Sequence, residues 1–186
     1  MNNSKNAKRL ISRIIKDDLE AFTELYSIYS AKVYQFSRYF ISSKETCEEV
    51  VSDVFINVWI NKEKLPEIQN FEAYLYVLTR NKAYNYLDKI NRNPEFAFDL
   101  SIEIQANSSN PEELLLSEEL EKVINSSINE LPERCRIIFL MSREEKLKYQ
   151  EIADILSISE KTVHAQMVTA LKKLNTSLKK YLYSFL

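Results

Sequence analysis

The chain of 186 residues contains no glycine, where an average protein has roughly 7%. Tight β-hairpins usually need glycine, because glycine adopts positive φ angles without steric cost, so its absence argues against a β-rich fold. The four prolines fall at the edges of periodic segments rather than inside them: Pro66, Pro94, Pro111 and Pro132. These features favour an all-α fold whose helices are joined by polar turns.

Histidine and cysteine are scarce as well. With one histidine and two cysteines, the chain has no HExxH motif and no paired-cysteine metal spacing, and it also lacks a glycine-rich phosphate loop. An enzyme is therefore the weakest interpretation, and we expect no catalytic residue, no metal site and no cofactor. Cys47 and Cys135 stand alone on predicted helices, so we expect them to be reduced packing residues of a cytosolic protein.

Long apolar runs are also missing. No stretch is apolar enough to cross a bilayer and no charged-then-apolar leader opens the chain, so we expect a cytoplasmic protein without membrane insertion. The net charge is only −2, but the charges are segregated. Nine acidic residues and one lysine lie between Pro94 and Glu130, whereas five lysines and no acid lie between Lys161 and Leu186. An acidic middle and a basic tail indicate separate partners.

Helical periodicity fills the first half of the chain. Met1–Lys8 is polar and is expected to fray. Apolar residues then recur at helical spacing over three stretches: residues 22–40, 45–60 and 71–91. Asn61–Asn70 is charged and broken by Pro66, and is therefore expected to be a loop. We predict that residues 1–93 form a helical bundle.

The second half begins with a break in this pattern. Residues 94–110 are irregular and end in an Asn/Ser cluster, which predicts a flexible acidic linker. Residues 111–186 form a second helical domain, in which Pro111 and Pro132 each open a helix. Its last two helices are Tyr149–Leu156 and the stretch after Ser159, joined by a three-residue turn. That spacing is typical of a helix-turn-helix.

The last helix has two different faces. One is an apolar stripe: Val163, Met167, Ala170, Leu171, Leu174 and Leu178. The other carries side chains suited to a DNA groove: Lys161, His164, Ala165, Val168, Thr169 and Lys172. Two helices packed in an ordinary core would show the same periodicity. The lysines of the tail favour DNA binding, because they can neutralise phosphates and release counterions.

The stretch from residue 71 to 91 interleaves tyrosine with arginine and lysine. Such a helix suits single-stranded nucleic acid, because aromatic rings stack on unpaired bases while cations follow the backbone. Each tyrosine could instead pack half-buried with its hydroxyl in water. A module for opened DNA tethered to a module for duplex DNA is what a promoter-opening factor needs.

Four segments, in this order, resemble the extracytoplasmic-function (ECF) group of bacterial sigma factors, which direct RNA polymerase to promoters. They are AFTELYSIYSAKVYQFSRYF, EEVVSDVFINVW, NFEAYLYVLTRNKAYNYLDKINR, and LPERCRIIFLM followed by YQEIADILSISEKTVHAQMVTALKKL. The resemblance covers nearly the whole chain. It implies a sigma subunit that binds core polymerase, recognises −35 and −10 promoter elements and promotes strand opening.

The resemblance also implies roles for individual residues. The polymerase-binding residues would be Glu48, Glu49, Asp53, Phe55 and Trp59. The loop at Asn61–Asn70 would capture a flipped base, and the opened −10 strand would meet Asn70, Tyr74, Arg80 and Tyr84. The −35 major groove would meet Lys161, Thr162, His164, Ala165, Val168, Thr169 and Lys172. The implied partners are the β′ clamp helices and β flap of core RNA polymerase, promoter DNA and an anti-sigma factor.

The chain departs from the family pattern in several places. Ser157 stands where relatives commonly have glycine, so a non-glycine residue would adopt a left-handed conformation. Lys148 stands where a capping Ser or Thr is usual. Asn85 and Asp88 stand where relatives often have Asp and Arg, so no −10 contact is expected from Asp88. The predicted recognition helix has no arginine, so readout would depend on His164, Gln166, thymine-methyl contacts and DNA shape.

Two other functions remain possible from the residues alone. A helix-turn-helix regulator could dimerise through its N-terminal bundle without touching polymerase. In a different class, the chain could be a helical scaffold or an anti-sigma-type interaction protein. Tight palindrome binding by a free dimer would favour the regulator, and absence of DNA crosslinking would favour the scaffold.

Overall fold

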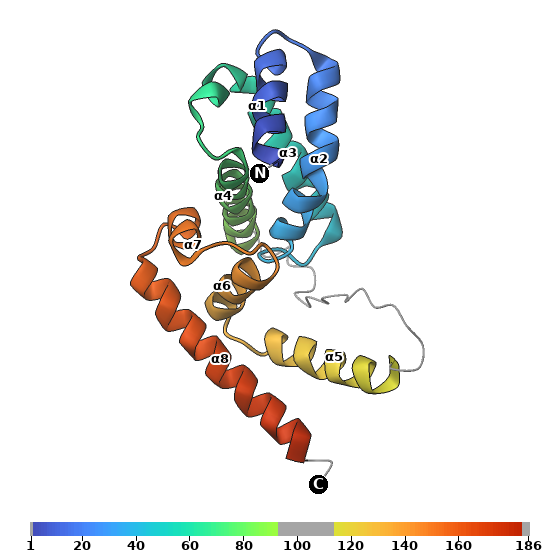
Figure 1. Cartoon of the computed structure of the whole chain (residues 1–186), viewed down its shortest axis with the longest axis vertical. Coiled ribbons are helices and arrows are strands. Elements are labelled where there is room, and N and C mark those ends of the chain that lie inside the picture. The colour runs from blue at the N-terminus through green and yellow to red at the C-terminus, as the bar shows by residue number, and fades with distance from the viewer. Residues whose placement is uncertain (1, 93–113, 184–186) are drawn as a thin grey trace. The chain divides into compact units, whose positions relative to one another are not determined.

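The computed structural model describes residues 2–92 and 114–183, and every regular element in these two ranges is helical (Figure 1). The all-α prediction is therefore confirmed. The chain divides into two compact units, residues 1–101 and 102–186. The described part of the first unit holds helices α1 to α4, and that of the second holds α5 to α8. The predicted linker, residues 94–110, lies outside the described residues.

Helix α1 spans Asn2–Ile14, so the expectation that Met1–Lys8 would fray is wrong for residues 2–8. The helix forms because Ala7, Leu10, Ile11 and Ile14 recur at helical spacing and are at most 5% exposed. They pack toward α2 and the segment after α3. Polar residues dominate the first turns, and the apolar face that holds the helix becomes visible only from Ala7 onward.

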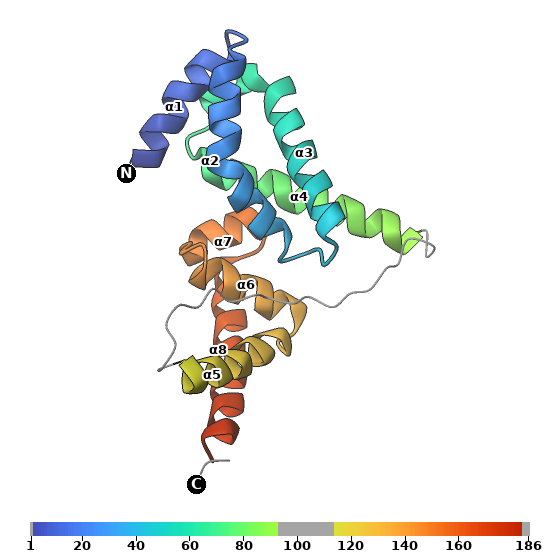
Figure 2. The same cartoon turned by 90° about the vertical axis from the view of Figure 1, so that its right-hand side faces the viewer.

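Helices α2 (Leu19–Ser37) and α3 (Lys44–Ile60) form the centre of the first unit, and Figure 2 shows them side by side. Each begins at a capping side chain. Asp18 accepts a hydrogen bond from the Ala21 N–H at 3.0 Å, and Ser43 accepts one from the Thr46 N–H at 3.2 Å. The cap bond and then Arg13 hold the pKa of Asp18 below its usual value.

The segment between α3 and α4 is more regular than expected. Lys62–Glu67 forms a 3-10 helix, η1, with Pro66 inside it, so the loop prediction is wrong for these residues. Burial explains the order, since the Leu65 side chain is only 1% exposed. Lys62 also pairs with Asp17, which lies just after α1. Helix α4 then spans Phe71–Arg92, close to the predicted range.

The second unit contains α5 (Leu114–Asn129), α6 (Glu133–Arg143), α7 (Tyr149–Leu156) and α8 (Glu160–Tyr183). Helices α7 and α8 form the predicted helix-turn-helix. Ser159 caps α8 as predicted, because its Oγ accepts a hydrogen bond from the Thr162 N–H at 3.0 Å. Ser157 adopts the expected left-handed conformation, with φ 56° and ψ 48°.

The apolar stripe of α8 is narrower than predicted. Val163, Met167, Ala170 and Leu174 are buried, whereas Leu171 is 53% exposed. Placing Leu171 on the buried stripe was therefore wrong. Helices α5, α6 and α7 cover one side of α8 and do not reach this position.

Candidate functional site

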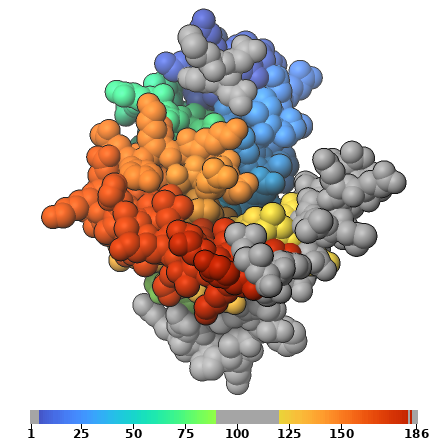
Figure 3. Space-filling model, turned by 60° about the horizontal axis from the view of Figure 1, so that its bottom comes forward, coloured from blue at the N-terminus to red at the C-terminus, as the bar shows by residue number. Residues whose placement is uncertain are grey.

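The outward face of α8 carries the side chains expected to read DNA. Lys161, His164, Ala165, Val168, Thr169 and Lys172 are all exposed, and Thr162 is partly exposed. Between them Val163, Met167 and Ala170 point into the core at 0%, 6% and 0% exposure. The seven residues therefore share one surface, and much of α8 faces the viewer in Figure 3.

Several side chains on this face are held by neighbours. The Thr162 hydroxyl lies 2.7 Å from the Ser159 hydroxyl, so the helix cap engages it. The His164 ring meets the Tyr149 ring edge-on, with centroids 6.1 Å apart. Gln166 is turned toward α6, because its Oε1 accepts a hydrogen bond from the buried Cys135 thiol at 2.7 Å. His164 and Gln166 were the two polar side chains expected to contact bases of the −35 element. Of these two, His164 is thus the more available to DNA.

The charge of α8 suits a polyanion. No acidic residue follows Glu160. The helix carries five exposed lysines: Lys161, Lys172, Lys173, Lys179 and Lys180. None of the ion pairs recorded between described residues uses one of them. Their charges are consequently available for phosphate contacts.

The residues expected at the −10 element gather on one face of α4. At 100° per residue, Asn70, Tyr74, Arg80 and Tyr84 fall within about 120° of the helix circumference. That face is opposite Thr79 and Ala83, which are 0% exposed. Tyr84 is 44% exposed and stacks edge-on against Phe40, with centroids 5.5 Å apart. An aromatic and cationic strip therefore runs along the outside of α4.

Packing decides the role of another tyrosine. Tyr76, one of the interleaved tyrosines of this helix, is 1% exposed and contacts Phe36 at a centroid distance of 4.5 Å. At this position the packing interpretation was the right one. Tyr74 is half-buried, and burial raises the pKa of its hydroxyl.

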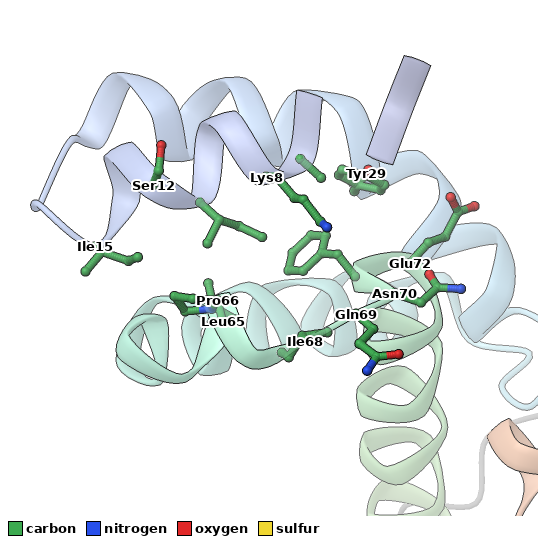
Figure 4. A pocket seen from close by; sticks show the side chains of 13 residues that line it. Lys8, Ser12, Ile15, Tyr29, Leu65, Pro66, Ile68, Gln69, Asn70 and Glu72 are labelled. Atoms are coloured by element: carbon green, nitrogen blue, oxygen red, sulfur yellow. The ribbon is translucent and has the colours of Figure 1, made fainter. Parts of the chain in front are cut away.

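A cavity of about 300 Å³ lies beside the start of α4 (Figure 4). Its apolar walls come from Ile11 of α1, Leu65 and Pro66 of η1, and Phe71 of α4. Its polar lining includes Lys8, Ser12, Gln69, Asn70 and Glu72. The Asn70 side chain also caps α4, because its Oδ1 accepts a hydrogen bond from the Ala73 N–H at 3.1 Å. The sequence did not indicate that α1 supplies a wall of this cavity.

The acidic surface of α3 is tied to α4. Glu48 and Glu49 are exposed, and Asp53 Oδ2 lies 3.0 Å from the Lys82 ammonium. The Tyr86 hydroxyl donates a hydrogen bond to Glu49. Burial and then this bond raise the pKa of Tyr86 to about 12. Two side chains of α4 thus orient two of the carboxylates on which polymerase binding was expected to depend.

Two apolar residues expected on this surface are placed differently. Phe55 is 2% exposed and packs against Tyr26 and Phe22, at centroid distances of 4.7 and 6.4 Å. Its side chain supports α3 from inside and is not part of the surface. Trp59 is partly exposed, with the Lys62 ammonium 4.4 Å above its ring.

Exposed isoleucines take the place expected for Phe55. Ile56 is 55% exposed and Ile60 is 72% exposed. Together with Glu49 and Asp53 they follow the spacing i, i+4, i+7 and i+11, which places all four on one face of α3. The spacing of these four residues is visible in the sequence. However, α3 has many apolar residues, and the sequence alone does not show which of them are exposed.

Other chemistry finds no support in the described ranges. Residues 2–92 and 114–183 contain no group of three His, Cys, Asp or Glu side chains placed to hold a metal ion. Both cysteines are buried and unbridged, as expected for packing residues. Among the helices that the structure describes, none is long and apolar enough to cross a membrane.

The fold and these surfaces define a helical DNA-binding protein with a C-terminal helix-turn-helix. Residues 25–93 match the family "Sigma-70 region 2", and residues 122–174 match the family "Sigma-70, region 4". The first match contains α3, η1 and α4, and the second contains the helix-turn-helix.

Curated relatives agree with these two matches. The ECF RNA polymerase sigma-E factor of Escherichia coli (strain K12) is 30% identical over 169 residues, covering 87% of this chain and 88% of the relative. The ECF RNA polymerase sigma factor SigW of Bacillus subtilis (strain 168) is 25% identical over 170 residues, covering 86% and 90%. The chain belongs to the ECF RNA polymerase sigma factors. It is an RNA polymerase sigma subunit that acts in promoter recognition and transcription initiation.

Solved structures share the fold. The sigma factor RpoE from Bartonella quintana, in a co-crystal with the anti-sigma factor NepR, has a TM-score of 0.67 and 19% identity, covering 85% of this chain and 96% of that chain. CnrH, in complex with the cytosolic domain of CnrY, has a TM-score of 0.63 and 20% identity, covering 94% and 98%. At these identities the likeness concerns the fold alone.

Proposed function

We propose that three exposed faces of this sigma factor serve three separate contacts. The outer face of α8 reads the −35 element, the outer face of α4 and its cavity hold the opened −10 strand, and the exposed face of α3 docks on polymerase. Residues 1–93 and 111–186 act as the two modules, with residues 94–110 between them. The observation that carries this proposal is that the side chains assigned to each contact are exposed or partly exposed, whereas other side chains of the same helix are buried in the core.

At the −35 element, phosphate contacts and base contacts are made by different side chains. Lys161 and Lys172 supply charge to the backbone, while His164, Thr169 and the small Ala165 and Val168 side chains meet base edges and thymine methyl groups. The face has no arginine, which is the best partner for guanine. We therefore expect an A·T-rich element whose recognition depends partly on DNA shape.

At the −10 element, the cavity beside α4 receives an unpaired base. Its lining combines apolar side chains with polar ones, Gln69 and Asn70 among them, which suits a flat ring with hydrogen-bonding edges. Tyr74 and Tyr84 offer ring faces for neighbouring bases, and Arg80 offers charge for the backbone. Lys8 extends from α1 across the same cavity and adds a second cation (Figure 4).

The polymerase contact combines carboxylates with apolar side chains. Glu48, Glu49 and Asp53 would meet the β′ clamp helices, and Ile56 and Ile60 would supply the apolar contact in place of Phe55. Trp59 would lie at the edge of this contact. The second unit would meet the β flap. An interface with an apolar centre and a charged rim is the usual arrangement.

Three further points belong to the same proposal. The chain has no catalytic activity of its own and acts in the cytoplasm through polymerase. An anti-sigma factor is a further partner, by likeness to the RpoE–NepR complex. Because it would compete with polymerase, it would have to cover at least one of the faces described above.

The experiment is co-elution with sigma-free core polymerase, followed by run-off transcription from a pool of genomic promoters. We expect a stoichiometric complex that starts transcripts at discrete sites. Glu48→Lys/Asp53→Lys should weaken the complex. Glu63→Lys/Glu67→Lys, which makes the same charge change at exposed sites of η1, should not weaken co-elution. Full-strength binding by the first double variant would remove the α3 assignment, and no complex at all would favour a dimeric regulator.

A further inference from the structure

His164 is the only histidine of the chain and lies exposed on the face of α8 that meets DNA. It is not surrounded by solvent on every side. The Tyr149 ring of α7 approaches it edge to face, with 6.1 Å between the centroids and 75° between the ring planes. This distance and angle lie within the range of favourable aromatic pairs.

We propose that Tyr149 is a positioning residue that sets the orientation of the His164 imidazole for reading the −35 major groove. Tyr149 thereby determines sequence preference from outside the recognition helix. The inference rests on the proposed −35 role of α8. It adds that the base contact made by His164 depends on Tyr149, a residue of α7.

Both rings are attached to backbone that is held in place. Tyr149 is the first residue of α7, and the preceding Lys148 N–H donates to the Glu151 carboxylate at 2.8 Å. This bond is one half of a capping box, the half in which the side chain of the third helical residue accepts from the N–H of the cap residue. His164 stands one turn after the start of α8, where Ser159 caps the helix. The two rings thus stand on capped helix starts of α7 and α8, two helices that pack against each other.

The remaining side chains of the face explain why this orientation matters. Lys161 and Lys172 carry flexible point charges, while Ala165 and Val168 have no hydrogen-bonding groups. The Thr162 hydroxyl is engaged by Ser159, the Thr169 hydroxyl donates to the Ala165 carbonyl, and the partly buried Gln166 is turned inward by the bond from Cys135 to its Oε1. The imidazole is therefore the one planar group with hydrogen-bonding nitrogens on the exposed face between residues 161 and 172. A planar group discriminates between bases only if its plane is held at a suitable angle.

Because the contact is a ring contact, the ring rather than the hydroxyl of Tyr149 should matter. Tyr149→Phe keeps the ring and removes the hydroxyl, whereas Tyr149→Leu removes the ring and keeps apolar volume. His164→Ala and the double variant Tyr149→Leu/His164→Ala complete a cycle that isolates the coupling between the two positions. Each variant is reconstituted with core polymerase as the full chain, and base preference is read from promoters with randomised −35 bases.

We expect Tyr149→Phe to keep the wild-type preference. Tyr149→Leu should lose about 3- to 10-fold preference at the base that His164→Ala also affects, the range expected for one aromatic pair. The double variant should be no worse than His164→Ala. Effects that multiply in the double variant, or a Tyr149→Phe loss as large as that of Tyr149→Leu, would show that Tyr149 contacts DNA on its own and would overturn the inference.

The His164→Ala variant separates this inference from the proposed function. If His164→Ala changes no base preference while charge loss at Lys161 and Lys172 still weakens promoter binding, the −35 role of α8 stands and the positioning role is overturned. If none of these changes affects promoter use, the −35 assignment itself is wrong. Thermal unfolding and polymerase co-elution of each variant exclude a general loss of fold.

A second measurement needs no DNA. Because the chain has one histidine, its imidazole protons give unique signals in a proton NMR spectrum of the full chain. The Tyr149 ring should shift these signals from their free positions, and Tyr149→Phe should preserve the shift. Identical signals in wild type and Tyr149→Leu would mean that the ring contact is absent in solution and would overturn the inference.

Discussion

The Lys82 ammonium lies 3.0 Å from Asp53 Oδ2, an ion pair that joins the helix expected to hold the −10 strand to the helix expected to dock on polymerase. The two side chains are 30% and 40% exposed, so the pair contributes only about 0.2–1 kcal/mol to stability. Its more important effect is to limit the orientations of the Asp53 carboxylate.

Removing the lysine should therefore affect binding more than folding. We expect Lys82→Met to weaken core polymerase binding by about threefold, in line with the loss of one exposed ion pair. The measurement is competition for core polymerase between wild-type and variant chains. Lys64→Met, at an exposed lysine of η1, is the matched control. Tighter binding by Lys82→Met would mean that the pair withholds Asp53 from polymerase instead of presenting it.

A second prediction concerns high pH. Burial and the Glu49 carboxylate raise the pKa of Tyr86 to about 12, above its ordinary value of 10. The folded chain thus holds this proton more tightly than the unfolded chain does. The resulting stabilisation is complete below pH 10 and is lost as the pH rises from 10 to 12.

The Tyr86→Phe variant isolates this hydroxyl. In a spectrophotometric titration, the difference between wild type and Tyr86→Phe should show one tyrosine ionising near pH 12. Glu49→Gln should bring that transition closer to pH 10, because the acceptor loses its charge. A wild-type difference curve centred at pH 10 would contradict the hydrogen bond between α3 and α4.

A third prediction compares two neighbouring residues of α3. Phe55 is 2% exposed, so Phe55→Ala should destabilise the first unit by about 3–5 kcal/mol through loss of core packing. Ile56 is 55% exposed, so Ile56→Ser should leave stability nearly unchanged and weaken polymerase binding. Urea unfolding and polymerase co-elution measure the two effects. Normal polymerase binding by both Ile56→Ser and Ile60→Ser would remove the isoleucines from the interface.

A fourth prediction concerns the turn of the helix-turn-helix. Ser157 has φ 56° and ψ 48°, a conformation in which its Cβ is crowded. Ser157→Gly should stabilise the second unit by up to about 1 kcal/mol, because the relief of crowding exceeds the added freedom of the unfolded chain. Thermal unfolding measures the gain. Ser157→Ala retains the Cβ and should give none, so an equal gain in both variants would point to the lost hydroxyl instead.

Local pattern was sufficient for much of the fold. The range Tyr149–Leu156 and the Ser159 cap were predicted as the structure has them, because helical periodicity and capping depend on residues close in sequence. The α1 helix was missed for the same reason. Its first turns are polar, and its short apolar face stabilises a helix only because that face packs against α2 and η1.

The candidate surfaces depended more on packing. The helical spacing of apolar residues in α8 predicted which face is exposed, since one stripe of that helix is clearly apolar. Most positions of α3 are apolar or acidic, and the sequence did not show that Phe55 is buried while Ile56 is exposed. Likewise Tyr76 is a core residue and Tyr84 a surface residue, although both belong to the same interleaved pattern.

By itself the sequence determined that this protein is helical, that it carries a helix-turn-helix, and that its family resemblance is to ECF sigma factors. These properties reside in local spacing and in short motifs. Only the tertiary structure decided that α1 walls the cavity beside α4, that Lys82 and Tyr86 hold the carboxylates of α3, and that Tyr149 meets His164. Such contacts join residues at least 15 positions apart, and their formation depends on how whole helices pack, which no local pattern encodes.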